Sequence, residues 1–172
     1  MAELSSFLGI RKEMQMNPTK VIFLDVDGVL NDGATKDRAP GGCIGLSAHM
    51  IGNLKKIIDA TSAKIVLVST WKREWSIDPN ERSEDGEYLH NSLSAVGIDI
   101  ADKTVDNITD RGTGIKNWLK EHPEVEKWIV LDDDVFGDYL ECGVLHHLVH
   151  TRYLYGGLTE DCAQIAIGLL NH

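Results

Sequence analysis

The sequence contains little cysteine, no long apolar run and few basic residues. Its three cysteines, Cys43, Cys142 and Cys162, are widely spaced and form no CxxC pair, which excludes a disulfide framework and a zinc ribbon. Apolar runs such as VIFL at residues 21–24 are far too short to cross a bilayer. The first residues lack the basic start and long apolar core of a signal peptide. We therefore expect a cytoplasmic protein with reduced thiols and no membrane contact.

The scarcity of basic residues gives the chain an acidic balance. Lys and Arg number 17 against 27 Asp and Glu, so the formal net charge is −10 and the pI ≈ 5.0. Such a surface repels phosphate backbones and excludes a general electrostatic binder of nucleic acid, while a local basic site stays open. The 172 residues, 42% of them hydrophobic, suit one domain. We place that domain at residues 19–172, preceded by an appendage, residues 1–18, with a short helix.

Apolar runs alternate with amphipathic segments along this domain. The runs are continuous rather than alternating, which is typical of strands covered on both faces. The pattern predicts a three-layer α/β/α sandwich with a parallel, Rossmann-like sheet. We expect strands at residues 20–24, 64–68, 128–131 and 145–150, helices at 47–61, 88–96, 110–122 and 159–170, and loops at 31–45 and 72–86.

Polar residues stand at the ends of three of these strands. Asp25 and Asp27 follow the first, Ser69 follows the second, and Asp132, Asp133 and Asp134 follow the third. Ligands of parallel sheets bind beyond the carboxyl ends of the strands. Carboxylates gathered there repel one another unless a cation lies among them, so we expect a hard divalent ion, Mg²⁺, bound by oxygen atoms.

The same residues suit phosphoryl chemistry. Side chains two apart at a strand end can face one substrate, so of Asp25 and Asp27 one carboxylate can attack as a nucleophile and the other act as acid and base. Ser69 can donate a hydrogen bond to a phosphoryl oxygen. Arg111, at the start of a helix, can neutralise developing negative charge.

Four segments resemble, in order along the chain, the four motifs of the haloacid dehalogenase-like (HAD) superfamily. They are DVDGVL at 25–30, the apolar run into Ser69, a basic residue opening a helix, and LDDD at 131–134. LDVDGVLN, VLVSTWKREW, DRGTGIKNWL and IVLDDD look like the HAD domain of Swiss-army-knife RNA repair proteins. The resemblance covers roughly residues 19–172 and implies the predicted fold with a minimal cap or none.

The resemblance also implies residue roles. Asp25 is the nucleophile that forms an aspartyl-phosphate and binds Mg²⁺, and Asp27 is the general acid and base, with its backbone carbonyl toward the metal. Ser69 binds the transferring phosphoryl group. The third-motif cation is Arg111 or its rival Lys116. Two of the three adjacent aspartates hold the metal, with Asp132 and Asp133 favoured. We expect the substrate to lie against Gly28, Thr70, Lys72 and Lys116.

An acid at position 27 points to phosphomonoester hydrolysis rather than dehalogenation. The segments at 31–46 and beyond leave no room for a folded cap, which favours a large substrate such as a nucleic-acid end, unless residues 31–45 and 72–86 fold over a small ester. Two alternatives stay open: a catalytically silent module that binds a phosphorylated partner, and a small-molecule nucleotidase. Trp71 and Trp75 either stack on a base beside Lys72 and Arg73 or pack in the core.

Two other metal sites are excluded by their patterns. An EF-hand needs an acid at the last loop position, which here would be Lys36. Cys142, His146, His147 and His150 suggest zinc, and a helix would place the first, second and fourth on one face. The apolar residues between them are typical of a strand, however, so we interpret them as structural.

Overall fold

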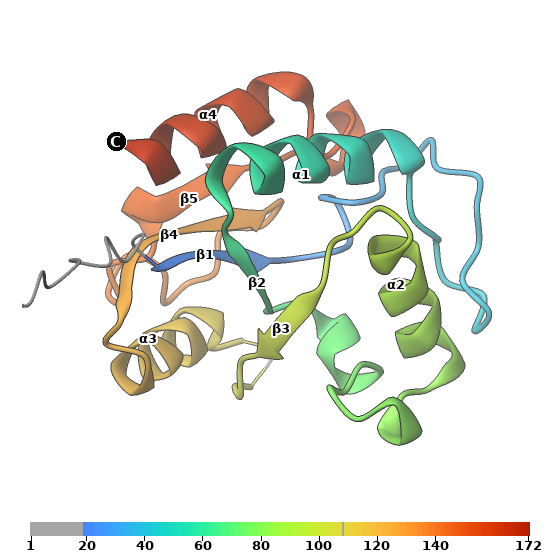
Figure 1. Cartoon of the computed structure of the whole chain (residues 1–172), viewed down its shortest axis with the longest axis horizontal. Coiled ribbons are helices and arrows are strands. Elements are labelled where there is room, and N and C mark those ends of the chain that lie inside the picture. Colours follow the sequence, from blue (N-terminus) through green and yellow to red (C-terminus); the bar gives the residue numbers. More distant parts are fainter. Residues whose placement is uncertain (1–18, 108) are drawn as a thin grey trace, which may run out of the picture.

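The computed structural model describes residues 19–107 and 109–172, so the N-terminal appendage and its expected helix lie outside the described residues. Five parallel strands form one sheet in the order β3-β2-β1-β4-β5 (Figure 1). Their bounds are β1 Thr19–Leu24, β2 Lys64–Leu67, β3 Ile100–Lys103, β4 Val125–Asp132 and β5 Leu148–His150. From β1 the chain builds β2 and β3 on one side and then β4 and β5 on the other side. In such sheets, ligands bind at this switch point, in the crevice at the carboxyl ends of the strands.

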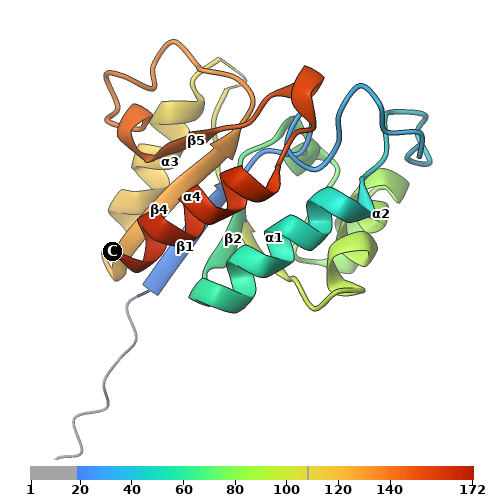
Figure 2. The same cartoon turned by 90° about the horizontal axis from the view of Figure 1, so that it is seen from above.

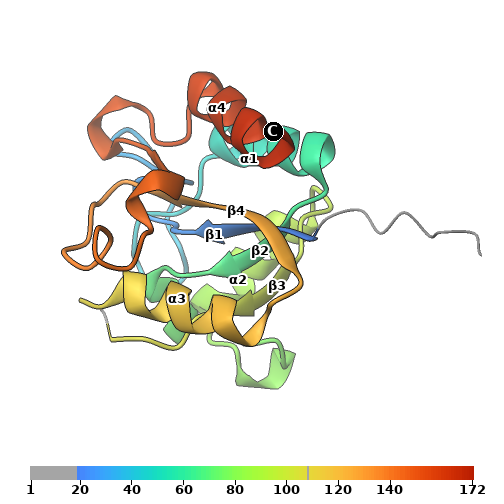
Figure 3. The same cartoon turned by 90° about the vertical axis from the view of Figure 1, so that its left-hand side faces the viewer.

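Helices cover both faces of the sheet, as the continuous apolar runs predict. Helices α1 (Ala48–Thr61) and α4 (Glu160–Asn171) lie on one face and α3 (Arg111–Glu121) on the other (Figure 3). Helix α2 (Glu84–Ser94) contributes Leu89 and Leu93 to the same hydrophobic cluster as α1 and α4. Alternate β1 residues enter the two clusters, Ile22 and Leu24 one, Val21 and Phe23 the other. The three-layer α/β/α sandwich is therefore confirmed.

Two helices begin where the sequence places them. Ser47 caps α1 by accepting a hydrogen bond from the Met50 N–H, and Thr159 caps α4 through the Cys162 N–H. Hydroxyl side chains at these positions satisfy backbone donors that the first turn leaves free. Apolar residues Leu54 and Ile57 of α1 are fully buried against the sheet.

Several boundaries differ from the sequence prediction. Helix α2 begins at Glu84, after a Ser83 cap, rather than at residue 88. Strand β3 was absent from the prediction because it is an edge strand whose only buried residue is Ile100. Residues 145–147 form a 3₁₀ turn, so the last strand is β5 alone. Strand β4 begins three residues earlier than expected, at Val125.

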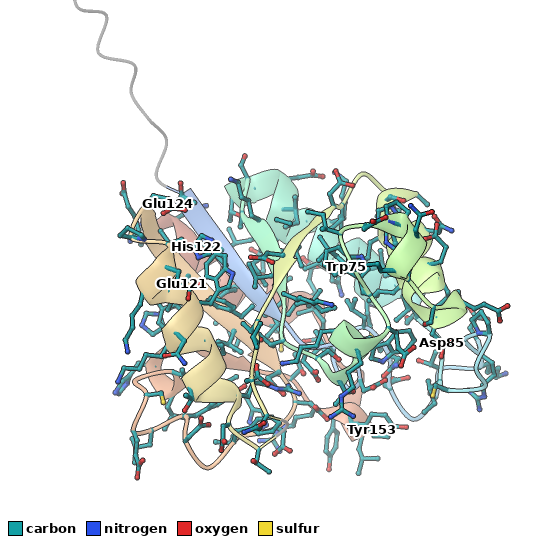
Figure 4. All side chains as sticks on the ribbon, turned by 90° about the horizontal axis from the view of Figure 1, so that it is seen from below. Trp75, Asp85, Glu121, His122, Glu124 and Tyr153 are labelled. Atoms are coloured by element: carbon teal, nitrogen blue, oxygen red, sulfur yellow. The ribbon has the colours of Figure 1, made fainter. Side chains whose placement is uncertain are left out.

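The long segment between β1 and α1 forms no folded cap. Residues 25–47 contain no helix, and they run away from β4 toward α2 (Figure 2). The Gly41 N–H donates to Asp85 Oδ1 over 2.7 Å, and the Leu46 N–H donates to the Tyr88 hydroxyl over 2.9 Å. Asp85 projects from α2 toward this segment (Figure 4). Among the described residues, no helix has the length and apolarity needed to span a bilayer.

Candidate active site

The carboxylates predicted from the strand ends meet at the carboxyl edge of β1 and β4. Asp25 follows β1 directly, and its N–H donates to the Leu131 carbonyl of β4 over 2.9 Å. Asp25, Asp132 and Asp133 each offer a carboxylate oxygen, and these three atoms lie within 4.8 Å of one another. Asp134 is exposed and is not part of this group. The structure thus brings together the first two of the three adjacent aspartates with Asp25.

Arg111, the first residue of α3, lies among these carboxylates. Its Nη1 is 3.1 Å from Asp25 Oδ1 and 2.7 Å from Asp132 Oδ2, and the guanidinium carbon lies 4.2 Å from the centre of the Phe136 ring. Lys116, on the same helix, is exposed. Of the two basic residues that the sequence left as rivals, only Arg111 contacts the candidate nucleophile.

The end of α3 that carries Arg111 is fixed by a residue that the sequence analysis missed. We predicted Asp110 or Thr113 as the cap, but Asp110 makes no capping bond through its side chain. Instead, the N–H groups of Gly112 and Thr113 donate to the Asp138 carboxylate over 3.1 and 2.8 Å. Asp138 is distant in sequence, so no local pattern could reveal it.

Asp132 is fully buried and accepts several hydrogen bonds. The Tyr139 hydroxyl donates to Oδ2 over 2.7 Å, beside Arg111, and the Asp134 N–H donates to Oδ1 over 3.0 Å. Burial, with the neighbouring Asp132 charge, raises the pKa of Tyr139 well above its ordinary value. Tyr139 therefore keeps its proton and acts as a donor. Its role was missed because a lone tyrosine seven residues away from the aspartate carries no sequence signal.

Burial of several like charges shapes the electrostatics of the site. Burial raises the pKa of Asp25 to about 7, with the Asp132 charge adding to the effect and the Arg111 charge opposing it. Burial and the neighbouring Asp132 and Asp134 charges also raise the pKa of Asp133. For Arg111, burial lowers the pKa, but the Asp25 and Asp132 charges outweigh that effect and leave it raised. A guanidinium alone does not relieve the repulsion among the carboxylates.

These residues fit a hard divalent cation. Asp25, Asp132 and Asp133 supply oxygen ligands, the type that Mg²⁺ takes from proteins. The raised pKa values of Asp25 and Asp133 indicate that additional positive charge would stabilise the ionised carboxylates. The Asp27 carboxylate is not part of the group of three.

Asp27 is exposed, yet both of its oxygens accept hydrogen bonds. Asn31 Nδ2 donates to Oδ1 over 2.8 Å, and Trp71 Nε1 donates to Oδ2 over 3.0 Å. Trp71 and Trp75 are 6% and 2% exposed and pack in the main hydrophobic cluster. The idea that they stack on a base was therefore wrong, because neither ring has a free face. Asn31 and the indole N–H of Trp71 were missed as site residues.

Gly28 serves the site through its missing side chain. Its φ is +79°, and a Cβ there would lie 2.2 Å from Asp133 Cγ. The Gly28 N–H donates to Asn31 Oδ1 over 3.0 Å and its carbonyl accepts from the Thr151 hydroxyl over 2.7 Å. The space that a Gly28 side chain would occupy is thus filled by Asp133, which only glycine allows to approach so closely.

The second strand end supplies Ser69 and a partly engaged lysine. Ser69 is fully buried, and its Oγ accepts a hydrogen bond from the Trp71 N–H over 3.4 Å. Thr70 is exposed. Lys72 forms an ion pair with Asp106 and donates to Thr104 Oγ1 over 3.3 Å. Burial lowers the pKa of Lys72 despite that pair. A small cavity lies between these groups and Arg111, lined also by Val68 and Arg73.

The rival zinc cluster does not form. Among residues 19–107 and 109–172, the group of three aspartates is the one cluster whose atoms could hold a metal ion. His150 Nε2 lies 2.9 Å from the Asp133 carbonyl and His147 Nδ1 lies 3.0 Å from the Trp128 carbonyl, so both rings have structural partners. The three cysteines are free thiols.

A parallel sheet in this strand order, with a buried aspartate cluster and a basic residue at its switch point, defines a HAD-like α/β protein. The family model described as "HAD domain in Swiss Army Knife RNA repair proteins" matches residues 21–163. The chain belongs to this family, and HAD domains generally are hydrolases. No curated protein and no solved structure matches the chain.

Proposed function

We propose that this protein is a Mg²⁺-dependent phosphomonoester hydrolase that acts through an aspartyl-phosphate on Asp25. One observation carries the proposal: the Asp25 carboxylate contacts Arg111 at 3.1 Å within a cluster of three acidic residues, while Asp27, two residues along the chain, is held separately. This separation gives two carboxylates two environments, one buried with charged neighbours and one exposed. Such a difference is what division into nucleophile and acid requires.

In the proposed reaction, an Asp25 oxygen attacks phosphorus and forms the new P–O bond. The bond between phosphorus and the ester oxygen breaks, its electron pair goes to that oxygen, and Asp27 supplies the proton. Asp27 then takes a proton from water as the water attacks the aspartyl-phosphate, releasing phosphate and restoring Asp25. Arg111 stabilises the negative charge near Asp25, and Ser69 orients a phosphoryl oxygen or the Asp25 carboxylate.

Mg²⁺ would be held by Asp25, Asp132 and Asp133, with the Asp27 carbonyl as a further ligand that the resemblance implies. When bound, it supplies positive charge that binds the phosphoryl oxygens and favours ionised Asp25. The Tyr139 and Arg111 contacts to Asp132 Oδ2 fix the orientation of that carboxylate. Supporting groups of this kind hold metal ligands in place.

For the substrate we propose a terminal phosphate of a nucleic acid, or a nucleotide. The described residues contain no folded cap over the strand ends, which supports access by a large substrate. The family description names RNA repair proteins. The net charge of −10 disfavours tight hold on a long backbone, which supports action at an end. Arg73 and Thr70, both exposed beside Arg111, are the residues we propose to meet the substrate.

The test is phosphate release from p-nitrophenyl phosphate and from 5′- and 3′-phosphorylated oligonucleotides, with Mg²⁺ or with EDTA. We expect release that EDTA abolishes and that Asp25→Asn reduces to background. Asp134→Asn is the matched control, since it removes one charge from the same loop outside the cluster. Activity that survives Asp25→Asn or ignores EDTA contradicts the mechanism. Binding of these ligands without turnover would favour a silent phospho-ligand module, and stronger competition by mononucleotides a nucleotidase.

A further inference from the structure

Trp71 connects the protein core to the exposed Asp27. The indole is 6% exposed and belongs to the main hydrophobic cluster, whereas Asp27 lies at the surface. The backbone of Trp71 is also fixed, because the Trp71 N–H donates to Ser69 Oγ over 3.4 Å and the Trp71 carbonyl accepts from the Trp75 N–H over 3.1 Å. The Nε1–H then reaches Asp27 Oδ2 over 3.0 Å. A rigid donor is thus aimed at a side chain that packing alone would not hold.

Asn31 completes the arrangement from the opposite side. It is fully buried, its Nδ2 donates to Asp27 Oδ1 over 2.8 Å, and its own Oδ1 accepts from the Gly28 N–H over 3.0 Å. Two donors on two different oxygens fix both torsions of the carboxylate. An amide N–H and an indole N–H are too weakly acidic to give a proton to a carboxylate at neutral pH, and both act only as hydrogen-bond donors toward this group. Any proton that Asp27 transfers therefore goes to or comes from the substrate side.

We propose that Trp71 is a positioning residue for proton transfer by Asp27. The inference rests on the proposed function, in which Asp27 gives a proton to the leaving oxygen. Trp71 does not contact the reacting atoms in this proposal, and it acts by holding the carboxyl group in one orientation. A misplacement of about 1 Å at such a group can cost about 10²-fold in rate.

The chain provides a matched control in Trp75. Trp75 lies in the same hydrophobic cluster and is 2% exposed. Among the described residues, its Nε1 is the buried side-chain polar atom without a hydrogen-bond partner. Trp71→Phe and Trp75→Phe remove the same atoms from the same core, but only the first removes a hydrogen bond to Asp27. A purely structural role for Trp71 predicts equal effects of the two substitutions on catalysis.

The experiment compares kcat/KM for two esters, p-nitrophenyl phosphate and β-glycerophosphate, with Mg²⁺. Nitrophenolate leaves without a proton, whereas the alkoxide of glycerol needs one. Because kcat/KM reports the steps up to departure of the leaving group, it isolates the acid role of Asp27. We expect Trp71→Phe to lower the alkyl value by about 10²-fold and the aryl value only a few-fold. Trp75→Phe should leave the ratio of the two values unchanged. An equal loss on both esters in Trp71→Phe overturns the proposal.

A second measurement tests the contact without activity. The four tryptophans give four indole N–H signals in a ¹H–¹⁵N spectrum of the wild type, assigned by single Trp→Phe substitutions. Asp27→Ala should move the Trp71 signal and leave that of Trp75 in place, and an unmoved Trp71 signal overturns the proposal. Failure of the proposed function is a separate result, in which the wild type hydrolyses neither ester, and the spectrum then decides alone whether Trp71 holds Asp27.

Discussion

Arg111→Met should destabilise the protein strongly, because it leaves two buried carboxylates without their cation. The guanidinium Nη1 lies 2.7 Å from Asp132 and 3.1 Å from Asp25, and the exposed fraction of each of the three side chains is at most 8%. Removing one partner of such a buried ion pair costs about 3–5 kcal/mol. For a chain of this length the cost corresponds to a fall in Tm of about 6–20 °C. Because methionine retains the apolar contact with Phe136, the loss of unfolding free energy measures the effect of removing the guanidinium charge.

The size of this loss should depend on pH in a defined direction. In the wild type, burial raises the pKa of Asp25 to about 7 against the opposing charge of Arg111. Removing Arg111 raises that pKa further. At pH 8 the wild type gains from the ion pair and the variant lacks it, so the difference in unfolding free energy is largest there. At pH 5 Asp25 is protonated in both proteins, so one of the two negative charges that Arg111 balances is gone. The difference in unfolding free energy between wild type and variant is therefore smaller at pH 5.

The assay is chemical denaturation of wild type and variant in EDTA at pH 5 and pH 8. Lys116→Met is the control, because Lys116 is exposed on the same helix and its loss should cost no more than about 0.5 kcal/mol. Arg111→Lys should recover part of the loss, since it restores the charge but not the forked geometry. Equal losses in the two Met variants, or a deficit for Arg111→Met that grows toward pH 5, would refute the reasoning.

Three further predictions concern the metal and the backbone. Mg²⁺ at 100 times its Kd should raise the unfolding free energy by about 2.7 kcal/mol in thermal-shift assays. Asp133→Asn should lose most of this gain, whereas Asp134→Asn should keep it. Equal gains in the two variants would argue against the proposed ligands. Gly28→Ala should abolish the Mg²⁺ response, because the new Cβ would overlap the Asp133 carboxylate. The control Gly42→Ala has φ +91° but no atom within 4 Å of its Cβ, so it should show only backbone strain of about 1–3 kcal/mol. A Mg²⁺ response retained in Gly28→Ala would contradict the overlap. Because the pKa of Asp25 is raised, the folded state in EDTA holds a proton on Asp25 at pH values where the unfolded chain has lost it. The unfolding free energy of the wild type relative to Asp25→Asn should therefore fall by up to about 4 kcal/mol as the pH rises from about 4 to about 7, and then level off. A rise over that range in denaturant titrations would show the sign to be wrong.

The sequence by itself determined the layers and the place of the site. Continuous apolar runs at β1, β2 and β4 require cover on both faces, and parallel strands carry their following residues to one edge. That reasoning places Asp25, Ser69 and Asp132 at the same edge of the sheet. Local chemistry also located α1 and α4, because Ser47 and Thr159 satisfy free donors of the first helical turn.

Only the tertiary structure decided which of several similar residues belong to the site. Arg111 and Lys116 carry the same charge on one helix, but only Arg111 is buried in contact with Asp25 and Asp132, whereas Lys116 is exposed. Trp71 could equally have stacked on a base, but the packing of β2 beside β1 places its indole N–H on Asp27, 44 residues away in sequence. Periodicity and caps record contacts within a few residues. The direction of a donor such as Trp71 Nε1 depends instead on how distant segments pack.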